Sequence, residues 1–144
     1  MVSIAIKPEY GYVIGVGIAS AFMCTWHGIT VGMARKKYGV KYPTMYANKA
    51  EVKEADAFNC YQRAHGNLME NYPQFLMMLF LGGVEHPLTA TACGLIWMAG
   101  RVAFALGYQT GDPSKRMNGA FQYIGLLSLL GLSVKFAYNL VSAA

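Results

Sequence analysis

Five polar side chains recur at helical spacing within an otherwise apolar part of the chain. Steps of 4, 4, 3 and 4 residues separate them, which at about 100° per residue keeps them on one helix face: Asn59, Arg63, Asn67, Glu70 and Gln74. A carboxylate accepts hydrogen bonds from an ammonium group, a guanidinium binds a carboxylate bidentately, and an amide can bond a peptide backbone both ways. This polar stripe therefore has the groups needed to bind a small ligand that carries amine and carboxylate groups.

A purely structural role accounts for the same spacing. In this alternative, Arg63 and Glu70 form a buried ion pair that holds a helix bundle together, and the amides make hydrogen bonds between helices. Spacing alone leaves both interpretations open.

A second set of polar residues is expected to gather near one end of the helices. Arg101 has Phe104 and Tyr108 on its own helix face, at i+3 and i+7. Tyr108 is expected near the end of the third span, at the same membrane face as Arg35, Lys115 and Arg116. Together these side chains favour an anion-binding entrance at that face. His65 lies in the turn between Arg63 and Asn67 and is expected to form a wall of the pocket, whereas His27, His65 and His86 are too scattered for a metal site.

Composition places these residues in a membrane protein. Hydrophobic residues make up 55% of the 144 and charged residues 13%, about half of the roughly 25% charge that is usual in soluble domains. A bilayer core needs about 20 helical residues, and the apolar segments predict four spans, at about 10–34, 58–84, 88–110 and 117–141. Pro73 is expected to kink the second span. The side chain of Lys135, near the end of the fourth span, is expected to reach toward the membrane interface. The short connections 85–87 and 111–114 favour antiparallel neighbours, so the fold class is an all-α, four-helix up-down membrane bundle forming one domain over 1–144.

The basic residues predict how the bundle is oriented. Eight of the twelve lie in the first and third connections: Arg35, Lys36, Lys37, Lys41, Lys49, Lys53, Lys115 and Arg116. By the positive-inside rule these connections face the cytosol and both termini face the lumen or exterior. The net charge of +5 is therefore mainly a topology signal, and no nucleic-acid partner is expected. Cys24, Cys60 and Cys93 lie in apolar stretches without a C-x-x-C pair and are expected to be buried free thiols.

Two motifs resemble one known family. The stretch FNCYQRAHGNLMENYPQFL contains an R-A-x-x-N-x-x-E core at Arg63, Ala64, Asn67 and Glu70, and the end of the third span reads GRVAFALGYQTGDPSKR. Together with TWHG, the RKK–YP pair and GGVEHP, these motifs resemble the MAPEG family, the membrane-associated proteins of eicosanoid and glutathione metabolism. The resemblance covers nearly the whole chain and is strongest to the type-3 microsomal glutathione S-transferases.

The resemblance implies a homotrimer that binds glutathione as a co-substrate at each subunit interface near the cytosolic face, without a metal. In relatives, the residues that match Arg63, Asn67, Glu70 and Tyr108 contact glutathione, as does the residue that matches Arg35, from the adjoining subunit. The thiol is activated by an arginine after the third span, which predicts Arg116 as the catalytic residue and Lys115 as the runner-up. The full predicted glutathione site is Arg35, Arg63, His65, Asn67, Glu70, Tyr72, Arg101 and Tyr108.

Three positions depart from the leukotriene-synthase relatives. Those relatives have a tyrosine where Asn71 stands, although Tyr72 follows, a tyrosine where Phe104 stands, and a glutamine where His65 stands. Glutathione binding is therefore expected on a partly different set of contacts, and leukotriene C synthesis is not the expected task.

The predicted function is that of a membrane-bound glutathione transferase and peroxidase of lipid metabolism and detoxification. Its partners would be glutathione, membrane lipid and a lipophilic electrophile or lipid hydroperoxide. The resemblance implies the endoplasmic reticulum (microsomal) membrane, with the outer mitochondrial membrane open. The alternatives are a non-catalytic scaffold that presents lipid, like the lipoxygenase-activating relative, and a small ion or solute conduit.

Overall fold

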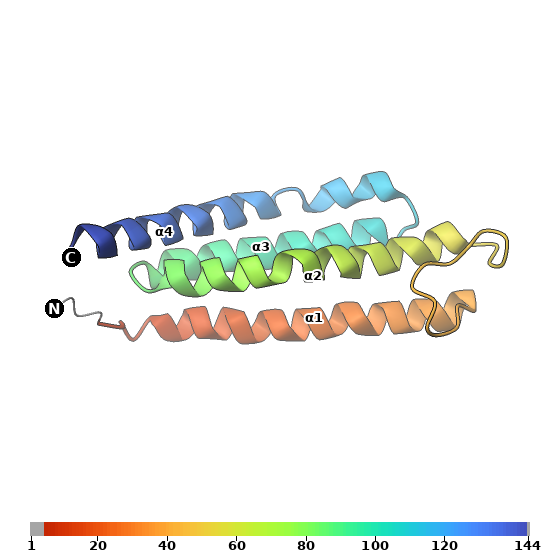
Figure 1. The fold of residues 1–144 in the computed structure, drawn as a ribbon, viewed down its shortest axis with the longest axis horizontal. Coiled ribbons are helices and arrows are strands. Elements are labelled where there is room, and N and C mark those ends of the chain that lie inside the picture. Colours follow the sequence, from red (N-terminus) through yellow and green to blue (C-terminus); the bar gives the residue numbers. More distant parts are fainter. Residues whose placement is uncertain (1–4, 144) are drawn as a thin grey trace.

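The computed structural model describes residues 5–143, which form a bundle of four antiparallel helices with one short 3-10 helix (Figure 1). In chain order the elements are α1 (Tyr10–Tyr38), α2 (Ala55–Gly83), α3 (Pro87–Tyr108), η1 (Pro113–Gly119) and α4 (Gln122–Ser142). The loop 39–54 and η1 lie at one end of the bundle, and the start of α1 and the end of α4 lie at the other (Figure 1). The predicted all-α, up-down bundle is confirmed.

Length and composition divide the four helices into two kinds. α1, α3 and α4 are long and apolar enough to cross a membrane. α2 has 29 residues and is therefore about 43 Å long, but it carries the polar stripe and falls short of the same hydropathy. It continues as one α-helix through Pro73.

The connection between α3 and α4 differs from the prediction. The fourth span was expected from residue 117, but residues Pro113–Gly119 form η1 and α4 begins only at Gln122. Pro113 and Asp112 start the 3-10 turn, since the Asp112 carboxylate accepts from the backbone N–H of Ser114. The predicted span 117–141 therefore combines the end of a capped 3-10 turn with the helix that follows it.

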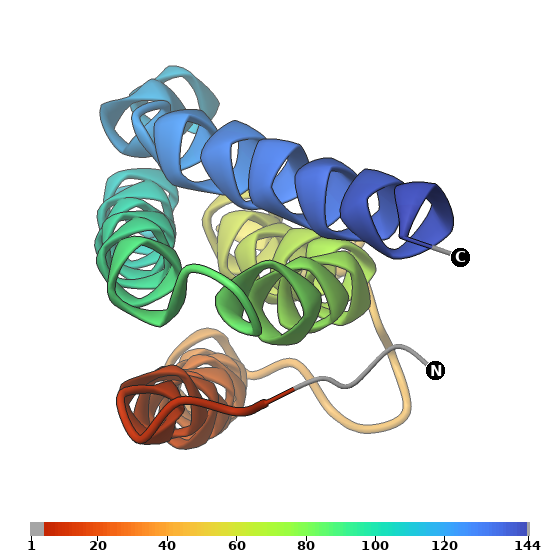
Figure 2. The same ribbon diagram turned by 90° about the vertical axis from the view of Figure 1, so that its left-hand side faces the viewer.

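α2 and α3 lie side by side, with α1 on one face of this pair and α4 crossing the other (Figure 2). The centre of the core is a stacked pair of rings, Phe75 of α2 and Trp97 of α3, with centroids 3.7 Å apart. Leu68, Leu79 and Leu129 complete the fully buried layer around them. The core therefore fixes the rotation of α2 about its own axis, and with it the direction of the polar stripe.

Glycines allow the backbone after α3 to return closely along it. At Gly107 a Cβ atom would collide with the carbonyl oxygen of Lys115, and at Gly125 it would collide with the carbonyl oxygen of Cys93. Gly111 adopts a φ of 86° at the turn between α3 and η1, a value that L side chains rarely adopt. This close return holds η1, and therefore Arg116, against the end of α3.

Candidate functional site

The polar stripe lies on the outside of the single bundle. α2 buries Ala64, Leu68 and Phe75 against the other helices. The stripe lies on a different face, where Arg63 and Glu70 are exposed. The ligand-binding groups predicted from the sequence are therefore accessible from outside the chain.

Arg63 and Glu70 form a bidentate ion pair on this outer face. Arg63 Nη1 donates to Glu70 Oε1 at 2.7 Å and Nη2 donates to Oε2 at 3.2 Å. The two side chains are 44% and 54% exposed. Because both residues belong to α2 and neither is buried, the alternative of a buried pair that joins helices within this chain is wrong.

Two adjoining hollows surround the stripe at the end of the bundle that holds the long loop. The first, of about 390 Å³, is lined in part by Arg63 and Tyr108. The second, of about 330 Å³, shares these two residues and adds Asn67 and Arg116. The structure thus brings together four of the predicted site residues, from α2, α3 and η1, while Glu70 joins them through its pair with Arg63.

Arg116 is positioned by the turn that opens η1. Asp112 Oδ1 accepts from the backbone N–H of Ser114 at 2.9 Å and from its hydroxyl at 2.7 Å, and these bonds hold the pKa of Asp112 below its usual value. Arg116 Nη1 donates to the carbonyl oxygen of Pro113 at 3.0 Å, and its guanidinium carbon lies 6.0 Å from the centre of the Tyr108 ring. Lys115 is exposed and is not among the residues that line either hollow.

Arg101 lies behind the hollows, in the interior of the bundle. Its side chain is only 2% exposed, and Nη1 donates to Asn67 Oδ1 at 2.9 Å and to Gln122 Oε1 at 3.0 Å. Because Asn67 Oδ1 accepts this hydrogen bond from Arg101 in the interior, the N–H groups of the Asn67 amide remain for a ligand. Arg101 Nε and Nη2 are buried without a hydrogen-bond partner among the residues that the structure describes.

Three further predicted residues lie away from the hollows of their own chain. His65 lies toward α1, with its ring centroid 6.4 Å from that of His27. The Tyr72 hydroxyl lies 2.9 Å from Ser20 Oγ. Arg35 Nη1 donates to the carbonyl oxygen of Thr44 at 2.7 Å, so this side chain braces the long loop. Their roles toward glutathione stay predictions.

The structure adds two tyrosines that no sequence pattern pointed to. Tyr46 of the long loop lines the first hollow and Tyr123 of α4 lines the second. The loop is held by Asn59, whose amide accepts from the N–H of Ala47 at 2.8 Å and donates to its carbonyl at 3.0 Å. The stripe residue Asn59 therefore shapes the site by fixing the loop that carries Tyr46.

The cysteines are free thiols, as predicted. Cys60 and Cys93 are buried, whereas Cys24 is only partly buried. Cys60 also lines the first hollow.

Comparisons with known proteins agree with the motifs. The model of the MAPEG family matches residues 13–138. The chain is 33% identical to human microsomal glutathione S-transferase 2 over 118 residues, which cover 81% of this chain and 75% of the human protein. The bovine protein of the same name is 30% identical over 116 residues, covering 80% and 74%. An uncharacterised protein of the cyanobacterium Synechocystis is 35% identical over 92 residues, covering 63% and 61%.

Proposed function

Because the chain belongs to the MAPEG family, we propose that it is a membrane-bound glutathione transferase that activates the glutathione thiol with Arg116. The family predicted from the motifs is confirmed, and the protein is an integral membrane protein. The type-3 subtype stays a prediction, since the human and bovine relatives carry the type-2 name.

The observation that carries the proposal is the convergence of Arg63, Asn67, Tyr108 and Arg116 on two adjoining hollows. Glutathione is a small peptide with carboxylates at both ends, one amine and one thiol. A guanidinium suits a carboxylate, the Asn67 amide suits a peptide carbonyl, and Glu70 suits the amine. Arg63 and Glu70 neutralise each other at the surface of the chain, so a ligand that is both acid and amine can replace each partner with its own charges.

Activation of the thiol follows from the charge of Arg116. A free thiol titrates near 8.5, and only the thiolate is the nucleophile. A cation a few ångströms away lowers such a pKa by about 1–3 units, and guanidinium keeps its charge at every relevant pH. The sulfur then attacks a lipophilic electrophile to form a C–S bond as the leaving group departs or a proton is added.

The same thiolate supports a peroxidase reaction. It attacks the O–O bond of a lipid hydroperoxide, and a second glutathione then completes the reduction. One hydroperoxide and two glutathione molecules give the lipid alcohol, water and glutathione disulfide. Both reactions start from one activated sulfur, so they share the same protein groups.

The outward direction of the polar stripe supports a homotrimer. Charged side chains on a lipid-facing helix surface are costly, at about 2.5–3.5 kcal/mol each at mid-bilayer, so Arg63 and Glu70 require cover. A neighbouring copy supplies it, and the predicted contact Arg35, which lies away from the hollows of its own chain, then serves the site of a neighbour. We place this assembly in the endoplasmic reticulum membrane, with the outer mitochondrial membrane as the other location.

Glutathione binding is the first test. Purified protein in detergent is titrated with glutathione, and its rates are compared with an aryl halide, a fatty-acid hydroperoxide and an epoxide. Saturable binding with turnover of at least one acceptor is expected. A lipid-presenting scaffold or an ion conduit would bind no glutathione, which would refute the enzyme proposal.

Arg116→Ala and Lys115→Ala are a matched pair for the catalytic assignment, because the two cations are adjacent in η1. Arg116→Ala should leave glutathione binding largely intact and lower turnover at pH 7 by about 25-fold, because losing a thiol pKa shift of about 2 units from a free value near 8.5 lowers the thiolate fraction by about that factor. Lys115→Ala should have little effect. The ultraviolet absorbance of bound thiolate reports the step directly, and equal losses in both variants would contradict the assignment to Arg116.

The assembly is tested by light scattering of the detergent-solubilised protein. The protein mass in the complex should be three times the chain mass of 15.7 kDa. A monomeric protein that still turns over glutathione would contradict the proposal that a neighbouring copy completes the site.

A further inference from the structure

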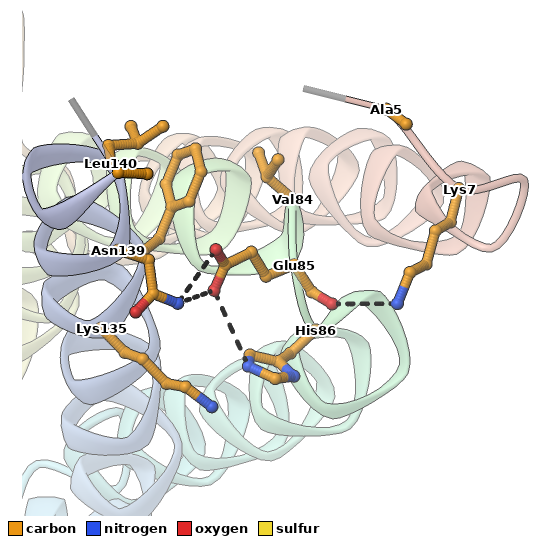
Figure 3. Close-up of a pocket in the computed structure, with 10 residues that line it drawn as sticks. Ala5, Lys7, Val84, Glu85, His86, Lys135, Asn139 and Leu140 are labelled. Carbon is orange, nitrogen blue, oxygen red and sulfur yellow. Dashed lines mark hydrogen bonds and ion pairs between the residues drawn. The ribbon is translucent and has the colours of Figure 1, made fainter. Parts of the chain in front are cut away.

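A second polar pocket lies at the opposite end of the bundle, away from the candidate site. It has a volume of about 480 Å³ and lies between the segment before α1, the turn from α2 to α3, and the last turns of α4 (Figure 3). Its polar lining includes Lys7, Glu85, His86, Lys135 and Asn139. None of these residues has a part in the proposed transferase reaction.

The carboxylate in this pocket already has a partner. Asn139 Nδ2 donates to both oxygens of Glu85, at 3.1 and 2.9 Å, and Lys7 Nζ lies 3.4 Å from the Glu85 carbonyl oxygen. His86 Nε2 is buried, lies 4.0 Å from a Glu85 oxygen and makes no hydrogen bond with any described residue. These contacts join the α2–α3 turn to α4 and to the segment before α1.

Lys135 is the cation that lacks a partner here. It is exposed on α4, and none of the ion pairs or side-chain hydrogen bonds among residues 5–143 includes it. In Figure 3 its ammonium group lies near His86, on the side of Glu85 and His86 opposite to Lys7. The pocket lining therefore has two ammonium groups but one carboxylate, and Asn139 already donates to both oxygens of that carboxylate.

The position of Lys135 indicates what supplies the missing anion. α4 is apolar enough to cross a membrane, and an ionised side chain within such a helix needs a counter-charge or a path to the interface. Beside the pocket, α4 exposes apolar side chains, including Val134, Tyr138 and Val141. A lipid whose acyl chains lie against this surface would place its phosphate at the level of the pocket.

We propose that this pocket binds the phosphate of a membrane phospholipid headgroup. Lys135 and Lys7 contact the phosphate from opposite sides, and His86 donates a hydrogen bond to it. Val84, Phe136 and Leu140 form the apolar wall beneath the headgroup. The bound lipid ties the end of α4 to the α2–α3 turn.

Lipid binding to the purified protein in neutral detergent tests the proposal, with short-chain phosphatidylglycerol as the probe. Each lysine near a membrane phosphate is worth about 1 kcal/mol, so Lys7→Gln with Lys135→Gln should weaken binding about 30-fold, and each single change about fivefold. Lys41→Gln with Lys53→Gln is the matched control, since it removes the same charge from exposed sites in the loop at the other end. Lys135→Arg keeps the charge and should retain binding.

Each outcome decides the proposal. Equal affinity in the wild type and the Lys7/Lys135 variants, or an equal loss in the control pair, would overturn it. Inorganic phosphate that displaces the lipid at similar concentration would mean a free-anion site and would overturn the assignment to a lipid. If the double variant does not fold, the two single variants and Lys135→Arg give the same decision.

Discussion

Two arginines near the candidate site lie in opposite environments. Arg63, on the outer face of α2, is 44% exposed at its side chain and has both of its terminal nitrogens paired with Glu70. Arg101, in the interior between α2, α3 and α4, is 2% exposed and donates to two neutral amide oxygens. The exposed arginine has a carboxylate partner, whereas the buried arginine has no carboxylate partner among residues 5–143.

This difference separates two tasks. The outer pair can exchange partners, because a ligand with a carboxylate and an amine replaces both halves of the pair. Arg101 is only 2% exposed, and its hydrogen bond fixes the orientation of the Asn67 amide. Under the proposed function, the outer region provides the ligand contacts and the inner region positions one of them.

Among the variants that test this difference, Arg101→Ala should cause the largest change in the stability of the fold. Asn67 Oδ1 and Gln122 Oε1 then lose their donor, and each buried acceptor left without a hydrogen bond costs about 1–3 kcal/mol. The midpoint of thermal unfolding in detergent should fall markedly, and the KM for glutathione should rise. Gln122→Ala is the control, because it removes the other amide partner and leaves the Asn67 contact. Arg101→Ala with unchanged stability and KM would remove the distinction between the two regions.

Arg63→Gln should weaken glutathione binding and leave the stability of the fold nearly unchanged. A hydrogen bond to a charged group contributes about 1.5–3 kcal/mol, so glutathione affinity should fall about 10- to 100-fold. An exposed ion pair contributes about 1 kcal/mol or less to stability, so the unfolding midpoint should barely change. Calorimetric titration and thermal unfolding of the same sample measure both. Gln74→Ala, at the far end of the stripe, is the control, and a loss of stability that exceeds the loss of affinity would contradict the comparison.

Substitution of Asp112 should have the smallest effect on turnover, because Asp112 acts on the outer site only by holding η1 in place. Asp112→Ala should lower turnover by displacing Arg116, whereas Asp112→Asn keeps a side chain that caps the turn and should retain most of the activity. Equal turnover in wild type, Asp112→Ala and Asp112→Asn would show that the cap does not position Arg116.

The pH dependence of the Asp112 contribution has a definite sign. Hydrogen bonds from Ser114 lower the pKa of Asp112 in the folded protein. Its contribution to stability is therefore fully present above the unfolded value of about 3.9, and it is lost as pH falls through the lower folded pKa. The difference in unfolding midpoint between wild type and Asp112→Asn should be constant at neutral pH and shrink in acid. A difference that grew toward low pH would contradict this origin.

Much of the fold could be predicted because membrane segments have a strong local signal. The bounds of α3 and the start of α1 lie close to the predicted spans, since apolar length marks them in the sequence. The predicted end of the first span was wrong, because α1 continues through the basic residues 35–37, which were assigned to the connection, to Tyr38, and α2 begins at Ala55, before its predicted start. The start of α4 was wrong, because the apolar residues from 117 continue through a 3-10 turn that depends on the Asp112 cap and on the close approach to Gly107. A hydropathy pattern carries no information on such a turn.

The candidate site was predicted as a set of residues, but its arrangement was not. The spacing of Arg63, Asn67 and Glu70 determined that they share one helix face, and the motifs determined the family. Tyr46 and Tyr123 carried no signal, because they reach the hollows from a loop and from a different helix. The structure places Arg101, which was predicted among the glutathione contacts, on the inner side of Asn67, and its role toward glutathione stays a prediction.

By itself, the sequence determined the four long helices, their orientation relative to one another, and the polar stripe on the second of them. Helical periodicity specifies angles about the axis of one helix, and this requires only neighbouring residues. Only the tertiary structure decided that the stripe lies outside the bundle, that Arg101 lies inside it, and that η1 brings Arg116 beside Tyr108. These arrangements depend on contacts between residues far apart in the chain, such as Arg101 with Asn67 and Phe75 with Trp97, which packing sets for all the helices at once.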